Sequence, residues 1–159
     1  MPTPQISKSD YDGYMNAAQS AIFHYQMIEQ ALKAYIFHAH EIVQLRMPQQ
    51  LAFNYSKNEY DSMPLERLLA VYAKFTQNKP LLKQLNGLRK SRNHIAHRSF
   101  ALAFLSSFDS GVSFAPEFSK VTDASANSLK AFIALKDELD SISKLNASLK
   151  EGEECGLIG

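Results

Sequence analysis

The stretch LLKQLNGLRKSRNHIAH, residues 81–97, decides the fold that the sequence predicts. Its core-type positions follow one another in steps of four, three, four and three residues, and they are Leu81, Leu85, Leu88, Arg92 and Ile95. This spacing places all five on one face of an α-helix. The helix must therefore pack against other helices, and an arginine lies on the side that packs.

Arg92 lies within about 40° of the three leucines on a straight helix, so it points where they point. An unpaired charge buried at that position would cost several kcal/mol. One explanation is an ion pair with another helix, and Glu29 is a candidate because it borders the apolar stripe of the first predicted helix. The other explanation is a cleft, for example at a subunit interface, in which the guanidinium holds a phosphate.

Periodicity on both sides of this stretch predicts further helices. Apolar residues recur at three- and four-residue intervals between residues 10 and 46, and Pro48 ends that long first helix. Start signals at Asp61, Ser62 and Pro64 open a short second helix that runs to Phe75, and Asn78 and Pro80 open the third. Residues 118–149 form the last predicted helix, after a loop over residues 106–116.

The predicted fold is therefore all-α, a bundle of four to five helices with a long first helix. Its 159 residues suit a single domain, which we place at residues 10–149. We expect a flexible amino terminus over residues 1–9 and a flexible acidic, glycine-containing tail over residues 150–159. No apolar run is long enough for a bilayer, and the first residues lack an apolar signal-peptide core, so we expect a cytoplasmic protein with no membrane partner.

Charge is unevenly distributed, although the net charge is only +1. No acidic residue occurs from Arg67 to Phe108, whereas eight lysines and arginines do. A basic block of this kind indicates an anionic partner such as RNA, because clustered cations attract phosphates and release counterions. A solvated helix face is the alternative explanation for the same pattern.

The segment Arg92-Asn93-His94-Ile95-Ala96-His97 resembles the R-x4-6-H motif of HEPN domains, including the polar residue directly after the arginine. The likeness extends to MIEQALKAYI in the first helix and to MPLERLLAVYAKF before the motif helix, and it covers roughly residues 10–148. It implies a dimeric, metal-independent ribonuclease in which the motif helices of two subunits form one cleft. Such enzymes act as toxins or defence effectors, so RNA, a second copy of the chain and a cognate antitoxin or regulatory protein are the implied partners.

The resemblance assigns catalytic roles to three residues. His97 would take the proton from a ribose 2′-OH, since histidine is the side chain that titrates near neutrality. Arg92 would hold the scissile phosphate with its planar fork, and Asn93 would contact the same phosphate or orient the histidine. The surrounding polar residues of the basic block are the expected RNA contacts: Lys83, Arg89, Lys90, His94 and Arg98.

The register of the motif has two versions. Arg92 and His97 are five positions apart, which separates them by about 140° on a straight helix. They converge if the helix ends or bulges there, or if the pair works across a dimer. Arg89 and His94 have the same spacing, but the first register carries the polar follower and lies on the packed face.

Other chemistries have weaker support in the sequence. His94 with His97, and His38 with His40, could each contribute to a metal site, but no Glu-x-x-His pair accompanies them, so neither a metal nor a cofactor is expected. The single cysteine, Cys155, excludes an internal disulfide. The alternative function is a non-catalytic HEPN-like helical module that binds a partner protein or a nucleotide.

Overall fold

The computed structural model describes residues 8–99, 101 and 115–156, and no β-strand occurs among them. In chain order the elements are α1 (Lys8–Arg46), α2 (Asn58–Asp61), α3 (Leu65–Phe75), α4 (Lys79–His94), the π-helix η1 (Ile95–Ser99) and α6 (Ala115–Gly156). The all-α class and the long first helix predicted from the sequence are confirmed. In this part of the chain, no helix is both long enough and apolar enough to cross a membrane.

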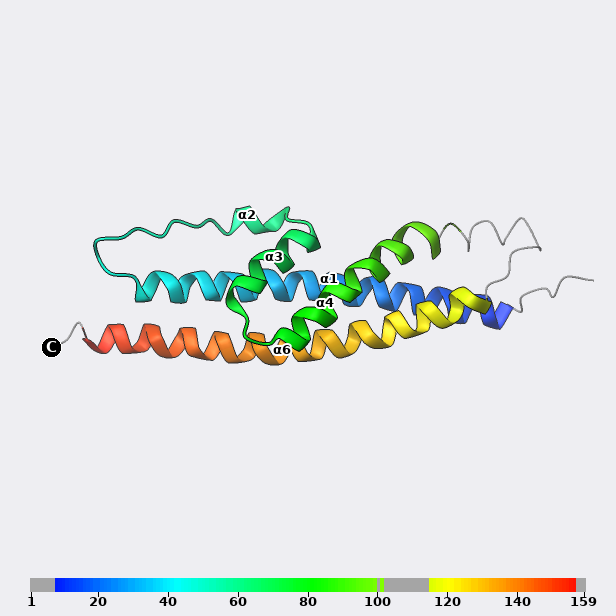
Figure 1. Ribbon diagram of the computed structural model, residues 1–159. Coiled ribbons are helices and arrows are strands. Elements are labelled where there is room, and N and C mark those ends of the chain that lie inside the picture. Colours follow the sequence, from blue (N-terminus) through cyan, green and yellow to red (C-terminus); the bar gives the residue numbers. More distant parts are fainter. Residues whose placement is uncertain (1–7, 100, 102–114, 157–159) are drawn as a thin grey trace, which may run out of the picture.

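The two long helices, α1 and α6, lie side by side and run in the same direction (Figure 1). Side-chain contacts fix that direction, because His24 bonds to Ser128 and, about four to five turns nearer the carboxyl end, His38 bonds to Asn146. At 1.5 Å per residue each helix is roughly 60 Å long. Parallel neighbours need a connection that returns the chain to its starting end, and α3 and α4 lie across the pair within that connection (Figure 1).

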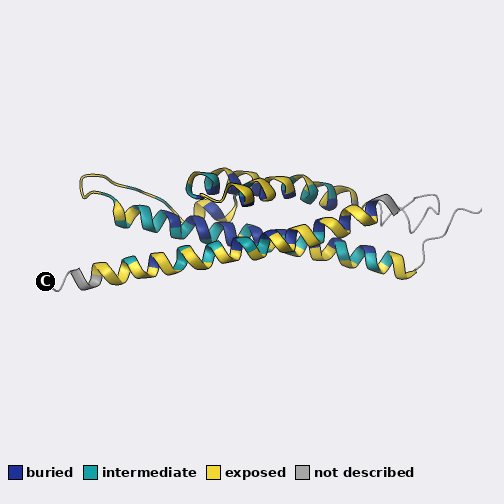
Figure 2. Cartoon of the chain, turned by 60° about the horizontal axis from the view of Figure 1, so that its bottom comes forward, coloured by how far each residue is buried: buried dark blue, intermediate teal, exposed yellow. Residues whose placement is uncertain are grey.

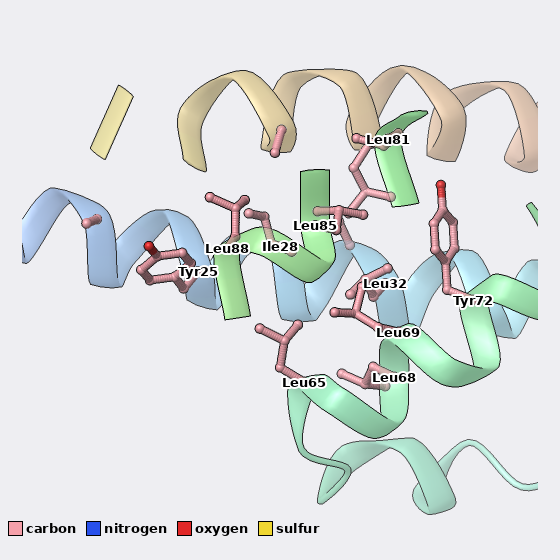
Figure 3. Close-up of a cluster of buried hydrophobic side chains, with 14 of the residues drawn as sticks. Tyr25, Ile28, Leu32, Leu65, Leu68, Leu69, Tyr72, Leu81, Leu85 and Leu88 are labelled. Atoms are coloured by element: carbon pink, nitrogen blue, oxygen red, sulfur yellow. The ribbon is translucent and has the colours of Figure 1, made fainter. Parts of the chain in front are cut away.

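The core lies where α3 and α4 pack on the middle of the long pair, and buried residues are concentrated there (Figure 2). Figure 3 shows leucines of α3 and α4 pointing at α1 and at one another. The predicted stripe of α4 is buried at each of its apolar positions, and α1 contributes side chains three or four residues apart, as its sequence pattern predicts. The buried residues of α1 are Tyr14, Ala18, Ala21, Tyr25, Ile28, Ala31, Leu32, Tyr35, Ile36 and Ala39.

The start of α4 matches its sequence signals. The Oδ1 of Asn78 accepts a hydrogen bond from the backbone N–H of Leu81 at 3.1 Å, and Pro80 lies in the first turn. This satisfies one of the backbone donors that every helix leaves free at its amino end. The cap fixes where α4 begins, and so it also fixes which residues lie at its other end.

The start of α3 differs from the prediction. Asp61 ends a separate short helix, α2, instead of capping α3, and α3 begins directly after Pro64 without a side-chain cap. Tyr60 explains this arrangement, because it is buried and draws the preceding residues against the core. The segment between α1 and α3 thus contains one helical turn.

The last helix is longer than its sequence pattern suggests. α6 extends from Ala115 to Gly156, so residues 150–156 are helical although we expected a flexible tail from residue 150. The ion pair between Lys150 and Glu41 of α1, at 3.0 Å, ties this end to the other long helix. Most of the loop expected over residues 106–116, and the first seven and last three residues of the chain, lie outside the described residues.

Candidate nucleic-acid interface

Arg92 occupies the last turn of α4, on the side that packs against α1. Its Nη2 lies 3.0 Å from Oε1 of Glu29, the partner that the sequence suggested for a structural role. The arginine side chain is 40% exposed, whereas that of Glu29 is 19% exposed. The ion pair therefore lies at the edge of the core, where the arginine side chain remains partly exposed to solvent.

Tyr25 packs beside this ion pair, one helical turn before Glu29. The ring is buried, and burial raises the pKa of Tyr25 to about 12 while the neighbouring Ser91 hydroxyl opposes part of that shift. The phenol is therefore neutral at physiological pH. Its ring forms part of the buried core under α4, and the neutral phenol does not act as a general base.

His94 is also bound to a carboxylate. Its Nε2 lies 2.6 Å from Oε2 of Glu117, which is buried in the first turn of α6. The hydrogen bond from His94 lowers the pKa of Glu117, partly against the effect of burial, and the charges of Lys120 and Arg98 lower it further. Glu117 is thus an ionised group that anchors the start of α6 to the end of α4.

Arg89 is the third residue of the block with an acidic partner. Its Nη1 lies 2.8 Å from Oε1 of Glu66 on α3, but the Glu66 side chain is 74% exposed. An exposed pair of this kind contributes little to stability, about 0–1 kcal/mol. The basic block contains no acidic residue along the sequence, yet in space α1, α3 and α6 each supply it with one.

The remaining predicted residues face solvent. Asn93 and His97 are exposed, and neither has a hydrogen bond or ion pair to another described residue. Lys83, Lys90 and Arg98 are exposed as well, and the first two lie seven residues apart on α4. Between these described residues, no side-chain hydrogen bond links Arg92 to His97 within one chain.

The helix changes type three residues after the arginine. From Ile95 to Ser99 the chain forms a π-helix, η1, while Ile95 itself stays buried in the core. A π-helix has more residues per turn than an α-helix, so the angular offset between the two motif residues differs from that on a straight α-helix. This meets the condition of a local bulge that the Arg92 and His97 register requires.

A cavity of about 470 Å³ lies between α4 and the first turns of α6. Lys90 and His94 line it from one side, and Lys120 and Asn127 line it from the other, together with Asp123. Sequence reasoning missed Lys120, Asn127 and Glu117, because no local pattern tells which turn of α6 lies against α4. The cavity brings two of the predicted RNA-contact residues together.

Metal ligation has no geometric support in the part of the chain that the structure describes, since no three His, Cys, Asp or Glu side chains group as a metal would need. The two histidines of the His38 and His40 pair point to different partners. His38 bonds to Asn146, whereas His40 bonds to the Tyr60 hydroxyl within a set of aromatic rings. Each is accounted for by a protein contact.

Comparison with known proteins gives no relative: no protein-family model, no curated protein and no solved structure matches this chain. Its function is therefore inferred from the residues and their geometry, together with the resemblance of the motif.

Proposed function

We propose that this chain is a metal-independent endoribonuclease of the HEPN type, acting as a homodimer. The observation that carries the proposal is the π-helix η1, which begins three residues after Arg92 and includes His97. Interruptions of this kind are rare in structural helices and are frequent at functional sites. Such a reaction needs accessible polar groups, and the partly exposed Arg92 side chain and the exposed Asn93 and His97 provide them.

In the proposed reaction, His97 accepts the proton of a ribose 2′-OH, and the resulting alkoxide attacks the adjacent phosphorus. The bond from phosphorus to the 5′-oxygen breaks, and that oxygen leaves with a proton supplied by the His97 of the second copy. Arg92 stabilises the negative charge that develops on the phosphate oxygens. The products are a 2′,3′-cyclic phosphate and a free 5′-hydroxyl.

A dimer forms part of the proposal because the resemblance implies a cleft shared by two subunits and no hydrogen bond joins the side chains of Arg92 and His97 within one chain. An isologous contact between the exposed ends of two α4 helices would place two copies of each residue around one cleft. Sedimentation of the full chain at micromolar concentration should then give about twice the 17.9 kDa mass of one chain. A toxin or defence role, with RNA as substrate and a cognate antitoxin or regulatory protein as inhibitor, is the biological setting that we infer for this activity.

The test is cleavage of single-stranded RNA in the presence of EDTA, with the products analysed for cyclic phosphate ends. His97→Ala should lower the rate by about 10² to 10⁴, the usual range for loss of a general base. Arg92→Lys should lower it comparably while keeping a cation beside Glu29, because lysine lacks the planar fork. RNA with a 2′-O-methyl group at the cut should resist cleavage.

Two control variants address the second register without unfolding the chain. His94→Gln retains a donor for Glu117, and Arg89→Ala breaks only an exposed ion pair. Both should keep most of the activity if Arg92 and His97 form the site. Inactive wild-type protein would instead overturn the enzymatic proposal.

The alternative candidate function is a non-catalytic helical module that binds a protein or a nucleotide. The ion pair of Arg92 with Glu29 and the hydrogen bond between His94 and Glu117 favour it, because two polar side chains of the motif segment already have partners within one chain. It predicts RNA or nucleotide binding without cleavage, and an Arg92→Ala variant whose only defect is lower thermal stability.

A further inference from the structure

A second cavity, of about 810 Å³, lies away from the motif end of α4. Its walls come from α1, from α6 and from the connection between α3 and α4, so it touches the opposite end of α4 at Asn78. Small-molecule pockets in proteins usually measure about 300–1,000 Å³ and combine apolar walls with a few placed polar groups. This cavity has the size and the composition of such a pocket.

One carboxylate in the wall is held in place by two hydroxyl groups. Oε2 of Glu138 accepts a hydrogen bond from the Tyr72 hydroxyl and another, at 3.3 Å, from Oγ1 of Thr76. Figure 3 shows the Tyr72 hydroxyl pointing out of the leucine core toward α6. Burial, together with the bond to Glu138, raises the pKa of Tyr72, so the phenol stays protonated and keeps donating.

The charge of the cavity is of one sign. Among the described residues that line it, Asp137 and Glu138 are the only ionisable groups with a charge at neutral pH, and both are acidic. Neither forms an ion pair with a described lysine, arginine or histidine. A half-buried carboxylate with hydroxyl donors but no cation still gains from a positive partner.

Much of the remaining wall is apolar, although Gln77, Asn78 and Ser141 also line it. Ile42 and Val43 of α1 line the cavity together with Ile142 and Leu145 of α6, and the Leu145 side chain is 51% exposed. Apolar surface left in water at a concave site favours a ligand that can cover it. A ligand that fits this cavity therefore has an apolar body, which covers the apolar walls, and a cationic group at one end, which binds the carboxylates.

We propose that this cavity binds a small organic ammonium ligand, whose cationic group lies against Glu138 and Asp137 and whose apolar body lies between α1 and α6. The ammonium would donate hydrogen bonds to carboxylate oxygens that Tyr72 and Thr76 hold in position. This site does not depend on the proposed ribonuclease function, because it shares no residue with the motif at the other end of α4.

Three indole compounds test the charge requirement on the unmodified chain. Tryptamine carries an ammonium, tryptophol a hydroxyl and indole-3-acetate a carboxylate on the same ring system. The chain contains no tryptophan, so excitation of the indole reports on the ligand alone. Titration should show saturable binding of one tryptamine per chain, roughly five- to tenfold weaker binding of tryptophol, and still weaker binding of indole-3-acetate.

Variants locate the site. Glu138→Gln should remove the preference of the protein for tryptamine over tryptophol, whereas Asp140→Asn, on the same helix but paired with Lys136 outside the cavity, should keep it. Ile142→Lys places a tethered ammonium four residues after Glu138 on the same helix, where the two side chains pair. The new ammonium should compete with tryptamine, so Ile142→Lys should lower the affinity of the protein for tryptamine at least as much as Glu138→Gln does.

Two results on the wild-type protein would overturn the proposal: no saturable tryptamine binding below about 1 mM, or equal affinities for tryptamine and tryptophol. A folded Glu138→Gln protein that retains the preference would also overturn it. Should that variant fail to fold, Ile142→Lys decides, because undiminished tryptamine binding there would place the ligand elsewhere.

Discussion

The guanidinium of Arg92 and the carboxylate of Glu29 lie 3.0 Å apart and join the last turn of α4 to the middle of α1. The arginine stands in a row of buried leucines, yet it reaches the edge of the core and stays partly open to solvent. This relationship permits both a structural and a catalytic role, and each role has its own measurable consequences.

The first prediction concerns how much that ion pair contributes to the free energy of unfolding. A double-mutant cycle of Arg92→Ala and Glu29→Ala, measured by urea unfolding, should give a coupling free energy of about 0.5–1 kcal/mol, since solvent screens the exposed side of the pair. The matched control is the pair of Arg89 and Glu66, whose glutamate is largely exposed. Its coupling should be smaller, and a larger one there would contradict the burial argument.

Acid should weaken the contact between α4 and α6. The pKa of Glu117 is lower in the folded chain than its ordinary value of 4.5, so the unfolded state binds more protons. The contribution of Glu117 to stability is therefore present above about pH 4.5 and is lost as the pH falls through the lower folded pKa. Unfolding free energies measured between neutral and acidic pH should decline less steeply for Glu117→Gln than for wild type or for the exposed-site control Asp12→Asn.

A second pH effect should occur nearer neutrality, at His40. Burial lowers the pKa of His40 against the smaller opposing effect of Glu59, and the rings of Phe53, Tyr55 and Phe75 lie about 5.2 Å from its own. The neutral ring is favoured in the folded state, so stability should fall as the pH drops below 6.5, the unfolded value. His40→Gln should flatten the melting temperature between neutral pH and pH 5.5, in a window above that of Glu117, whereas the exposed His97→Gln should not.

Shortening η1 by one residue tests the role of the π-helix. Deletion of the exposed Ala96 should restore α-helical hydrogen bonding and rotate His97 about the helix axis, because each π turn contains one residue more than an α turn. We expect a folded protein, shown by unchanged helical circular dichroism, that has lost RNA cleavage. Full activity in this variant would show that RNA cleavage does not depend on the π-helix.

The packing of α6 can be tested with two leucines on that helix. Leu135 is fully buried, so Leu135→Ala should lower the free energy of unfolding by about 2–5 kcal/mol. Leu129 is 42% exposed, and Leu129→Ala should cost much less. Denaturant titrations would give the free energy of unfolding of both variants, and the difference between them would test which face of α6 packs against α1.

Much of the fold could be read from local patterns. The stripe of Leu81, Leu85 and Leu88, the Asn78 cap and the stop at Pro48 each depend on neighbours within a few residues, and the structure agrees with all of them. The Glu29 partner could also be anticipated, since a charge on a buried seam requires a counter-charge and Glu29 borders the matching stripe.

Only the tertiary structure decided which faces meet. The parallel direction of α1 and α6, the bond of His94 to Glu117 and the cavity at Glu138 join residues 23 to more than 100 positions apart. Periodicity tells which side of a helix is buried, but it carries no information about the turn of another helix that lies against it. The sequence allowed a bulge at the motif, but the spacing of apolar residues does not distinguish α-type from π-type hydrogen bonding there. The start of α4 could be predicted because the Asn78 cap depends on a hydrogen bond to a residue only three positions away.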